Sequence, residues 1–118
     1  MVQTNVVVIG WNRAVAGREG LAGELFAHTT MYFDKQKSMG NIDSWQPVFL
    51  QRHGGDLNGF FLVTGTHAQL DSFKSNEEFL EIQMRADHCL QGFGVIDGYT
   101  GKIIPEMMNR WIKTIPSH

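Results

Sequence analysis

The chain has 118 residues, 42% of them hydrophobic, with ten basic and twelve acidic side chains and a formal net charge of −2. This length predicts a single domain over residues 1–118 with a core of its own. The balanced charge lacks the basic stripe of a nucleic-acid binder, and no apolar run is long enough to cross a membrane, so we expect neither partner. A single cysteine, Cys89, excludes an internal disulfide, and the first ten residues lack the basic region of a signal peptide. Both features favour a cytoplasmic protein.

The first part of the chain predicts a strand, a helix and a second strand. The segment TNVVVIGWN, Thr4–Asn12, is β-branched and almost continuously apolar, as in a strand buried on both faces. Apolar residues then recur at helical spacing through residues 17–40. A second strand is expected over Ile42–His53, where Pro47 cannot donate to a ladder and so favours a sheet edge or a bulge.

The stretch HGGDLNGFF, His53–Phe61, predicts a turn into a third strand, Gly59–Gly65. Asn58 and Gly59 form a favoured two-residue hairpin pair, because both tolerate positive φ. A wider loop around residues 54–56 is the alternative. In either case the second and third strands should pair antiparallel.

The second half predicts two helices, a strand and a terminal helix. THAQLDSFKSNEEFLEIQMRADHCL contains a capping-box pattern over Ser75–Glu78, where the second of its two helices should begin. GFGVIDGYTG, Gly92–Gly101, reads as a fourth strand that ends at Gly98. The tail IIPEMMNRWIKTIP predicts a short helix with Pro105 at its first position and an apolar stripe along one side.

This order of elements predicts an α+β fold, the ferredoxin-like βαββαβ arrangement with an added C-terminal helix. Right-handed crossovers place both main helices on one face of the sheet and leave the other face bare. The strands VVVI, FFLV and GVI are apolar on both faces, so the bare face needs a cover. We expect a homodimer in which two sheets face each other as a sheet-to-sheet dimeric α/β barrel. The alternative is that the terminal helix folds back over the bare face.

The segments VVVIGWNRAVAGRE, HGGDLNGFFLVTG, GFGVIDGYTG and SNEEFLEI resemble small uncharacterised bacterial proteins of the dimeric α/β-barrel superfamily, over nearly the whole chain. The resemblance implies a pocket between the sheet and its helices. It implies no single reaction, because the superfamily includes cofactor-independent quinone monooxygenases, heme-degrading monooxygenases, muconolactone-isomerase-like enzymes and stress-response proteins. The heme-degrading relatives use an asparagine, a tryptophan and a histidine. Asn5 or Asn12 and His88 could match two of these, but the third strand, GFFLVTG, has no tryptophan. We therefore expect no heme and no other cofactor.

The predicted topology gathers polar residues at one end of the sheet, where the first two strands finish and the last two begin. The residues expected there are Trp11, Asn12, Arg13, Arg52, His53, Asp56, Asn58, Asp87 and His88. No cysteine and histidine have the spacing of a metal site, so no metal is expected.

His53 and Asp56 are the sharpest catalytic candidates at this end. A carboxylate can fix the tautomer of a histidine that acts as a general base, and Arg13 could then hold an anionic oxygen. The alternative is purely structural: Asp56 would cap the loop backbone and His53 would be a solvated strand end.

Three further residues have weaker functional interpretations. His88 lies at the end of a helix, where a cation complements the dipole, and it is the second candidate base. His28 and Tyr32 are one helical turn apart and could face the sheet cleft together with Trp11. The structural alternative is that all three are surface or boundary residues.

Two functions remain open at this level. The first is a cofactor-independent monooxygenase or isomerase for an aromatic or lactone-like substrate, with His53 or His88 as base and Arg13 and Asn58 as polar orienters. The second is a non-catalytic dimer that binds a small apolar metabolite or serves in a stress response. In both, we expect a pocket lined by aromatic residues.

Overall fold

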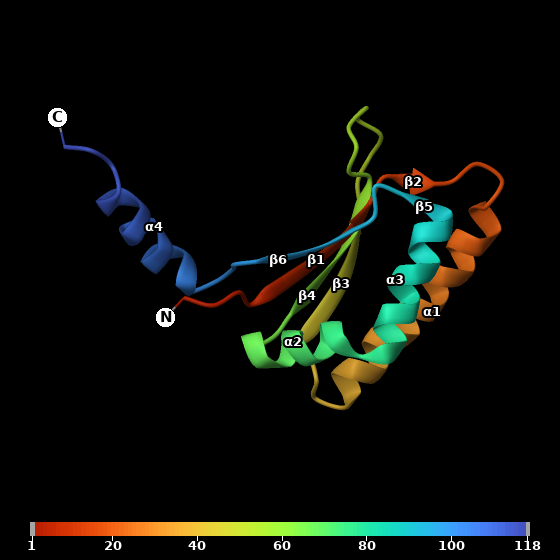
Figure 1. Ribbon diagram of the computed structural model, residues 1–118, viewed down its shortest axis with the longest axis horizontal. Helices are drawn as coiled ribbons and strands as arrows, with labels where there is room; N and C mark the ends of the chain where they lie inside the picture. The colour runs from red at the N-terminus through yellow and green to blue at the C-terminus, as the bar shows by residue number, and fades with distance from the viewer. Residues whose placement is uncertain (1, 118) are drawn as a thin grey trace.

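The computed structural model describes residues 2–117 (Figure 1). Its elements are, in chain order, β1 (Val6–Trp11), β2 (Arg13–Ala14), α1 (Glu19–Ser38), β3 (Ser44–Phe49), β4 (Gly59–Thr64), α2 (His67–Ser75), α3 (Glu77–Cys89), β5 (Leu90–Gln91), β6 (Gly94–Gly98) and α4 (Ile103–Lys113).

The main sheet has four strands in the order β3-β4-β1-β6, and every neighbouring pair is antiparallel. This is the ferredoxin-like arrangement that the sequence predicts. Pro47 lies in β3, at one edge of the sheet, as its missing N–H requires. The helices α1, α2 and α3 lie together on one side of the sheet (Figure 1). The sheet of a single chain is open, with β3 and β6 as its edges.

The core lies between the sheet and these helices. Val7, Ile9, Phe61 and Val63 point from the two central strands toward the helices and are almost completely buried. The helices contribute similarly buried residues to the same core: Leu25, Tyr32, Phe33, Leu70, Phe73, Phe79, Ile82, Ala86 and Cys89. Burial of this apolar surface is the main force that holds the helices on the sheet.

A second, two-stranded sheet was not predicted. Arg13 of β2 pairs with Gln91 of β5, and Ala14 pairs with Leu90. Flanking hydrogen bonds extend the pairing, since Val15 N–H donates to the Cys89 carbonyl at 2.8 Å. The small sheet therefore fixes the C-terminal end of α3 beside the end of β1.

Of the two predicted alternatives for the connection between β3 and β4, the structure has the wider loop and not the two-residue turn at Asn58 and Gly59. Chain reversal occurs farther out, where Gly54 has a φ of 79°. Asn58 instead continues the strand pairing, because its carbonyl accepts from Leu50 N–H at 3.0 Å. Its own N–H donates to the Trp11 carbonyl at 3.0 Å, which ties the hairpin to β1.

The break between α2 and α3 is confirmed, but its capping differs from the prediction. Ser75 is the last residue of α2, and Asn76 caps α3 by accepting a hydrogen bond from Glu78 N–H at 2.9 Å. The complete capping box lies at the start of α2, between Thr66 and Gln69.

The face of the sheet opposite the helices has no cover within the described chain. Strand register places Val8 between Leu62 and Ile96 in the middle of this face, and Gly10 beside Phe60. Ile96 is 59% exposed, and Val8, Phe60 and Leu62 are half-buried. We call this surface the open face. Its apolar centre agrees with the expectation that the inner strands are apolar on both sides.

The terminal helix α4 does not fold back over the open face, so that alternative is wrong. It projects from the end of β6, away from the rest of the domain (Figure 1), and none of its residues is buried. Pro105 is the third residue of this helix rather than its first.

Candidate functional site

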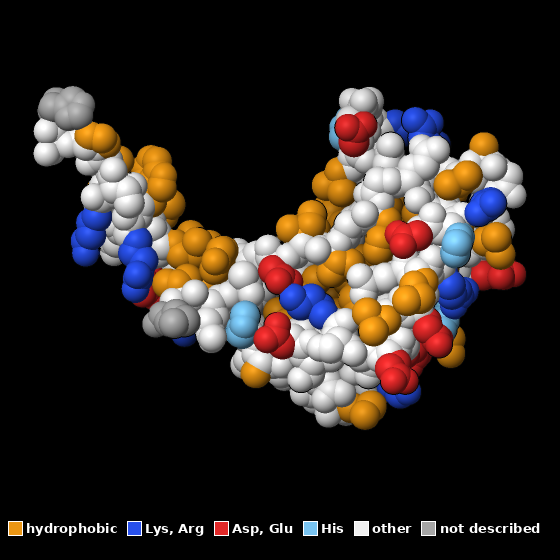
Figure 2. Space-filling model, in the orientation of Figure 1, with side chains coloured by type: hydrophobic (Ala, Val, Ile, Leu, Met, Phe, Trp, Pro, Cys, Tyr) orange, Lys and Arg blue, Asp and Glu red, His pale blue; other side chains and the backbone are white. Residues whose placement is uncertain are grey.

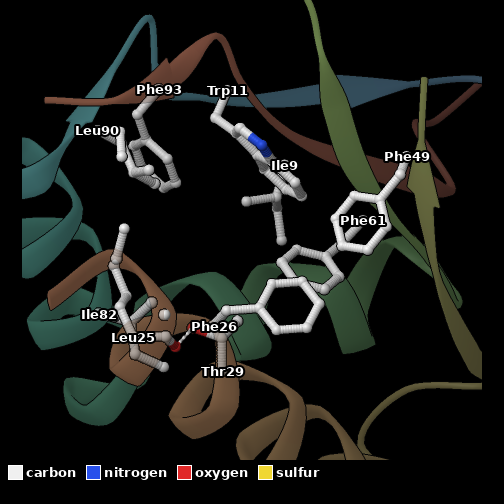
Figure 3. Close-up of a pocket in the computed structure, with 13 residues that line it drawn as sticks. Ile9, Trp11, Leu25, Phe26, Thr29, Phe49, Phe61, Ile82, Leu90 and Phe93 are labelled. Atoms are coloured by element: carbon white, nitrogen blue, oxygen red, sulfur yellow. Dashed lines mark hydrogen bonds between the residues drawn. The ribbon is translucent and has the colours of Figure 1, made fainter. Parts of the chain in front are cut away.

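An apolar cavity of about 250 Å³ lies between the sheet and its helices (Figure 3). It is formed where β1 ends, beside α1, α3 and the segment that leads into β6. The lining residues are Ile9, Trp11, Ala14, Ala22, Gly23, Leu25, Phe26, Thr29, Phe49, Phe61, Ile82, Leu90 and Phe93. The small residues Ala22 and Gly23 leave space unfilled on the α1 side of the cavity.

Four aromatic rings form one wall of the cavity. Trp11 packs edge-on against Phe26 and Phe49, with ring centroids 6.5 and 6.1 Å apart. Phe26 stacks on Phe61 at 5.3 Å. These rings come from β1, α1, β3 and β4, and Figure 3 shows them on one side of the cavity, opposite Leu90 and Phe93. Such contacts hold the rings in fixed relative orientations.

The cavity offers no ionisable side chain. The polar groups among its lining side chains are the Trp11 indole N–H and the Thr29 hydroxyl, and the Thr29 hydroxyl donates to the Leu25 carbonyl at 2.7 Å. That hydroxyl is therefore already engaged within its own helix. A charged ligand would lose its hydration here without gaining a counter-charge, so the cavity favours an uncharged apolar molecule.

Gly59 determines where the Trp11 ring lies. A Cβ atom at position 59 would come within 2.6 Å of Trp11 Cζ2 and 2.9 Å of Trp11 Cε2. Only a residue without a side chain allows the indole to lie flat against β4 at this point. The strand therefore uses a glycine to position one wall of the cavity.

A polar groove lies at the same end of the sheet. It brings together five of the nine residues predicted at this end, and its other lining residues are Gly54 and Gly55. The five are Asn12, Arg13, Arg52, His53 and Asn58. The cavity and the groove are neighbours at the end of β1. Trp11, the last residue of β1, lines the cavity, and Asn12, the next residue, lines the groove. The predicted gathering of polar residues at this end is therefore partly met.

The structure does not bring His53 and Asp56 together. Among residues 2–117, His53 forms no ion pair or hydrogen bond with Asp56. Both ring nitrogens of His53 instead form hydrogen bonds within the loop: Gly55 N–H donates to Nδ1 at 3.3 Å, and Nε2–H donates to the Leu57 carbonyl at 2.8 Å. The hydrogen-bonding pattern is that of a histidine that shapes its own loop. A general-base role for His53 with Asp56 stays a prediction that this geometry does not favour.

The Asn58 amide also has a structural partner. Its Nδ2 donates to the backbone carbonyl of Asn12 at 2.8 Å and to Asn12 Oδ1 at 2.6 Å. The side chain therefore joins the hairpin to the end of β1, and this bond would have to break before Asn58 could orient a ligand.

His88 lies apart from both the cavity and the groove. It is exposed on α3 and lines a separate hollow of about 220 Å³ with Leu21, Leu25, Arg85 and Cys89. Its carbonyl accepts from Arg18 Nη1. Cys89 beside it is buried, and burial raises the pKa of its thiol, as expected for an inert core cysteine.

His28 and Tyr32 do not face the cavity with Trp11, and the expectation that they share its cleft is wrong. Tyr32 is 1% exposed in the core, and its hydroxyl donates to the Phe73 carbonyl at 3.2 Å. His28 joins α1 to α3 through Glu78, with Nε2 and Oε2 3.0 Å apart. The two residues lie on the same side of α1, one turn apart, but neither lines the cavity: Tyr32 packs on Phe73 and Phe79, and His28 contacts Glu78.

Among residues 2–117, no cluster of histidine, cysteine and carboxylate side chains could hold a metal ion. Within the same residues, no helix combines the length and the apolar character needed to span a membrane.

Sequence reasoning pointed to Trp11 and to an aromatic lining, and it missed the other cavity residues. The cavity is a space left unfilled between residues of several elements, and no single segment carries a signal for it. The available signal was alternation: Ile9 and Trp11 on one strand, and Phe61 on another, share the helix-facing side of the sheet.

Comparison with known proteins supports the fold. No family model matches the chain, and none of the curated proteins matches it. Two solved structures are similar. A dimeric protein of unknown function and ferredoxin-like fold from Bacteroides fragilis aligns over 85% of this chain and 100% of its own, with a TM-score of 0.58 and 8% identity. The protein PA3566 from Pseudomonas aeruginosa aligns over 86% of this chain and 98% of its own, with a TM-score of 0.56 and 20% identity. At these identities the likeness shows a common fold and no common activity.

Proposed function

We propose that this protein is a homodimer in which each subunit binds a small, uncharged aromatic or apolar metabolite in the cavity between the sheet and its helices. The observation that carries the proposal is the lining of that cavity: five aromatic rings and a set of aliphatic side chains, with one threonine whose hydroxyl is already bonded.

The size of the cavity limits the ligand. An engineered apolar cavity of about 150 Å³ holds benzene in another protein. A volume of about 250 Å³ therefore suits a molecule somewhat larger than benzene, such as a two-ring aromatic. The aromatic wall favours an aromatic ligand, because contacts between aromatic rings add to the energy of burial.

Two observations support the dimer. The open face presents an apolar centre that soluble monomers rarely leave uncovered. The Bacteroides fragilis protein of the same fold is described as dimeric. In our proposal the open faces of two copies pack together, as expected for a two-fold contact that uses the same surface on each subunit.

The geometry favours binding over acid–base catalysis. A cofactor-independent monooxygenase or isomerase needs a group that accepts or delivers a proton within hydrogen-bond reach of the substrate. The candidate bases His53 and His88 do not line the cavity, and neither do Arg13 and Asn58. Catalysis would instead require the substrate to extend into the polar groove, where Arg13 and His53 lie.

The test is ligand binding by a variant whose cavity is blocked. Gly23 lines the cavity and has open space around the position of a Cβ atom, so Gly23→Leu places an isobutyl group at its mouth. We expect naphthalene, used as a probe, to bind the wild type and to bind Gly23→Leu at least about tenfold more weakly. Binding is measured by the fluorescence of Trp11 in a background where Trp45 and Trp111 are phenylalanine.

The matched control is Gly20→Leu. Gly20 lies one turn earlier on α1, also has open space, and does not line the cavity. It should bind the probe as the wild type does. Equal binding by both leucine variants, or no binding by the wild type, would refute the cavity as the site. Conversion of the probe or a lactone analogue to a product, seen by mass spectrometry, would instead favour the enzymatic alternative.

A further inference from the structure

The helix α4 is amphipathic but has nothing to pack against in its own chain. Ile104, Met108, Trp111 and Ile112 share one side of it and are between 40% and 59% exposed. The opposite side carries Glu106, Asn109, Arg110 and Lys113. An isolated helix of eleven residues is marginal in water, so a helix of this length depends on packing of its apolar side.

The dimensions of the molecule show how far α4 stands apart. The radius of gyration is 16.5 Å, whereas a compact chain of this length has one of about 13.5 Å. The chain exposes 7814 Å², roughly 1,400 Å² more than the value of about 6,450 Å² for a compact monomer of its mass. The excess exceeds the roughly 800 Å² that each subunit buries in a standard interface.

A second apolar surface lies at the other end of the open face. Leu50 and Leu57 of the β3–β4 hairpin are 36% and 42% exposed, and we call them the hairpin patch. The Leu57 side chain lies over Gly10, where a Cβ atom would come within 2.8 Å of Leu57 Cδ1. The patch is therefore continuous with the open face, to which Gly10 and Phe60 belong.

The arrangement of these surfaces is self-complementary. The hairpin and α4 extend from opposite ends of the strands (Figure 1), and the molecular surface between them is hollowed (Figure 2). The apolar side chains of α4 face this hollow, and its lysine and arginine side chains point away from it (Figure 2). A two-fold axis perpendicular to the strands brings the α4 of one copy to the hairpin end of the other. The occupant that fits the hollow is therefore a second copy of the same chain.

We propose that α4 is exchanged between the two subunits and packs with its apolar side against the hairpin patch of the partner. This inference rests on the proposed dimer and adds to it: the sheet faces form the centre of the interface, and each α4 encloses the hairpin of the other subunit. Each exchanged α4 thereby covers apolar surface that a single chain leaves exposed, both on the helix itself and on the hairpin of the partner.

Two variants, each defective on one side of this contact, test the exchange. Met108→Asp places a charge on the apolar side of α4, and Leu57→Asp places one in the hairpin patch. Each alone should raise the dimer dissociation constant at least about tenfold, measured by sedimentation equilibrium. Asn109→Asp adds the same charge on the polar side of α4 and should leave the constant unchanged. Leu50→Asp repeats the hairpin test at a second position, and circular dichroism checks that each variant is folded.

Mixing the two variants separates an exchanged arm from the alternatives. A mixed dimer contains one intact α4–hairpin contact and one contact with both defects, whereas each variant homodimer has two defective contacts. We therefore expect the mixture to form dimers at concentrations where each variant alone is monomeric. If Met108→Asp weakens the dimer but Leu57→Asp and Leu50→Asp do not, α4 packs elsewhere and the exchange is refuted. If all variants dimerise as the wild type does, the exchange is likewise refuted while the dimer stands; a monomeric wild type refutes both.

Discussion

At the scale of single residues, two positions show how the sequence builds the site and the core. Gly59 leaves room for the Trp11 ring, and Tyr32 brings a polar tip into the centre of the core. Both residues look ordinary in the sequence. Their roles depend on partners that lie 48 and 41 positions away along the chain, respectively, which a reading of local patterns does not reveal.

Gly59→Ala should displace the Trp11 ring and reshape the cavity. The added methyl group would meet the indole at 2.6 Å, and β4 cannot yield because it is paired on both sides. We expect a loss of about 1–3 kcal/mol in the free energy of unfolding, measured by urea denaturation, together with weaker binding of the aromatic probe. Gly20→Ala is the control: it has open space on α1 and should stabilise the protein by about 0.5–1 kcal/mol. An unchanged stability for Gly59→Ala would show that the ring is not held as we describe.

Tyr32 should make the protein sensitive to alkali. Burial, and secondarily the charge of Glu78, raises the pKa of its phenol far above the ordinary value of 10.0. A folded-state pKa above the unfolded value gives a stabilising contribution that is complete below pH 10.0 and is lost as the pH rises above it. The free energy of unfolding of the wild type should therefore fall more steeply above this pH than that of Tyr32→Phe.

Tyr32→Phe should also lower the stability of the folded protein at neutral pH. Tyr32→Phe removes the hydrogen bond to the Phe73 carbonyl and should destabilise the protein by about 0.5–1.5 kcal/mol at pH 7. Tyr99→Phe changes an exposed tyrosine and serves as the control. Parallel pH profiles for the wild type and Tyr32→Phe would contradict the assignment.

At the scale of elements, a polar network joins α1 to α3 above the core. Arg85 can only donate, so His28 Nδ1 accepts from it and His28 Nε2 carries the proton that is donated to Glu78. Lys35 Nζ lies 3.5 Å from the other oxygen of the same carboxylate. The network thus fixes both the tautomer of His28 and the relative position of the two helices.

Glu78 should make the contact between α1 and α3 sensitive to acid. The hydrogen bond from His28, with a contribution from Lys35, lowers the pKa of the Glu78 carboxyl below its ordinary value of 4.5. A lowered pKa gives stability that is present above 4.5 and is lost as the pH falls through the folded-state value. Glu78→Gln should therefore be less stable than the wild type at pH 7, and the difference should shrink in thermal melts below pH 4.5. Glu77→Gln removes a neighbouring carboxylate on the same helix turn and should not reproduce this pH dependence.

At the scale of the whole molecule, strand order and layer arrangement could be predicted, because the order of strands and helices, the handedness of the crossovers and the position of Pro47 restrict the topology. The form of the hairpin connection could not be, because Asn58 is held by Asn12 and Trp11 across the sheet, and these contacts override its preference for a turn. The direction of α4 could not be predicted either. An amphipathic stripe shows that one side of a helix needs a partner, but not which chain supplies it.

The predicted group of site residues shows the same limit of prediction from sequence. Topology placed Arg13, His53 and Asn58 at one end of the sheet, where the structure has them around one groove. Topology could not show that the His53 ring and the Asn58 amide would be used by the loop and by Asn12. Hydrogen bonds between neighbours in space decide whether a polar side chain is available to a ligand.

The central claim is that a second copy of the chain covers the open face. The most direct measurement is the mass of the wild-type protein in solution at micromolar concentration, by light scattering coupled to size-exclusion chromatography, beside Leu62→Asp, which places a charge at the centre of that face. The account predicts twice the chain mass of 13.3 kDa for the wild type and a shift toward 13.3 kDa for the variant. A wild type of 13.3 kDa would contradict it.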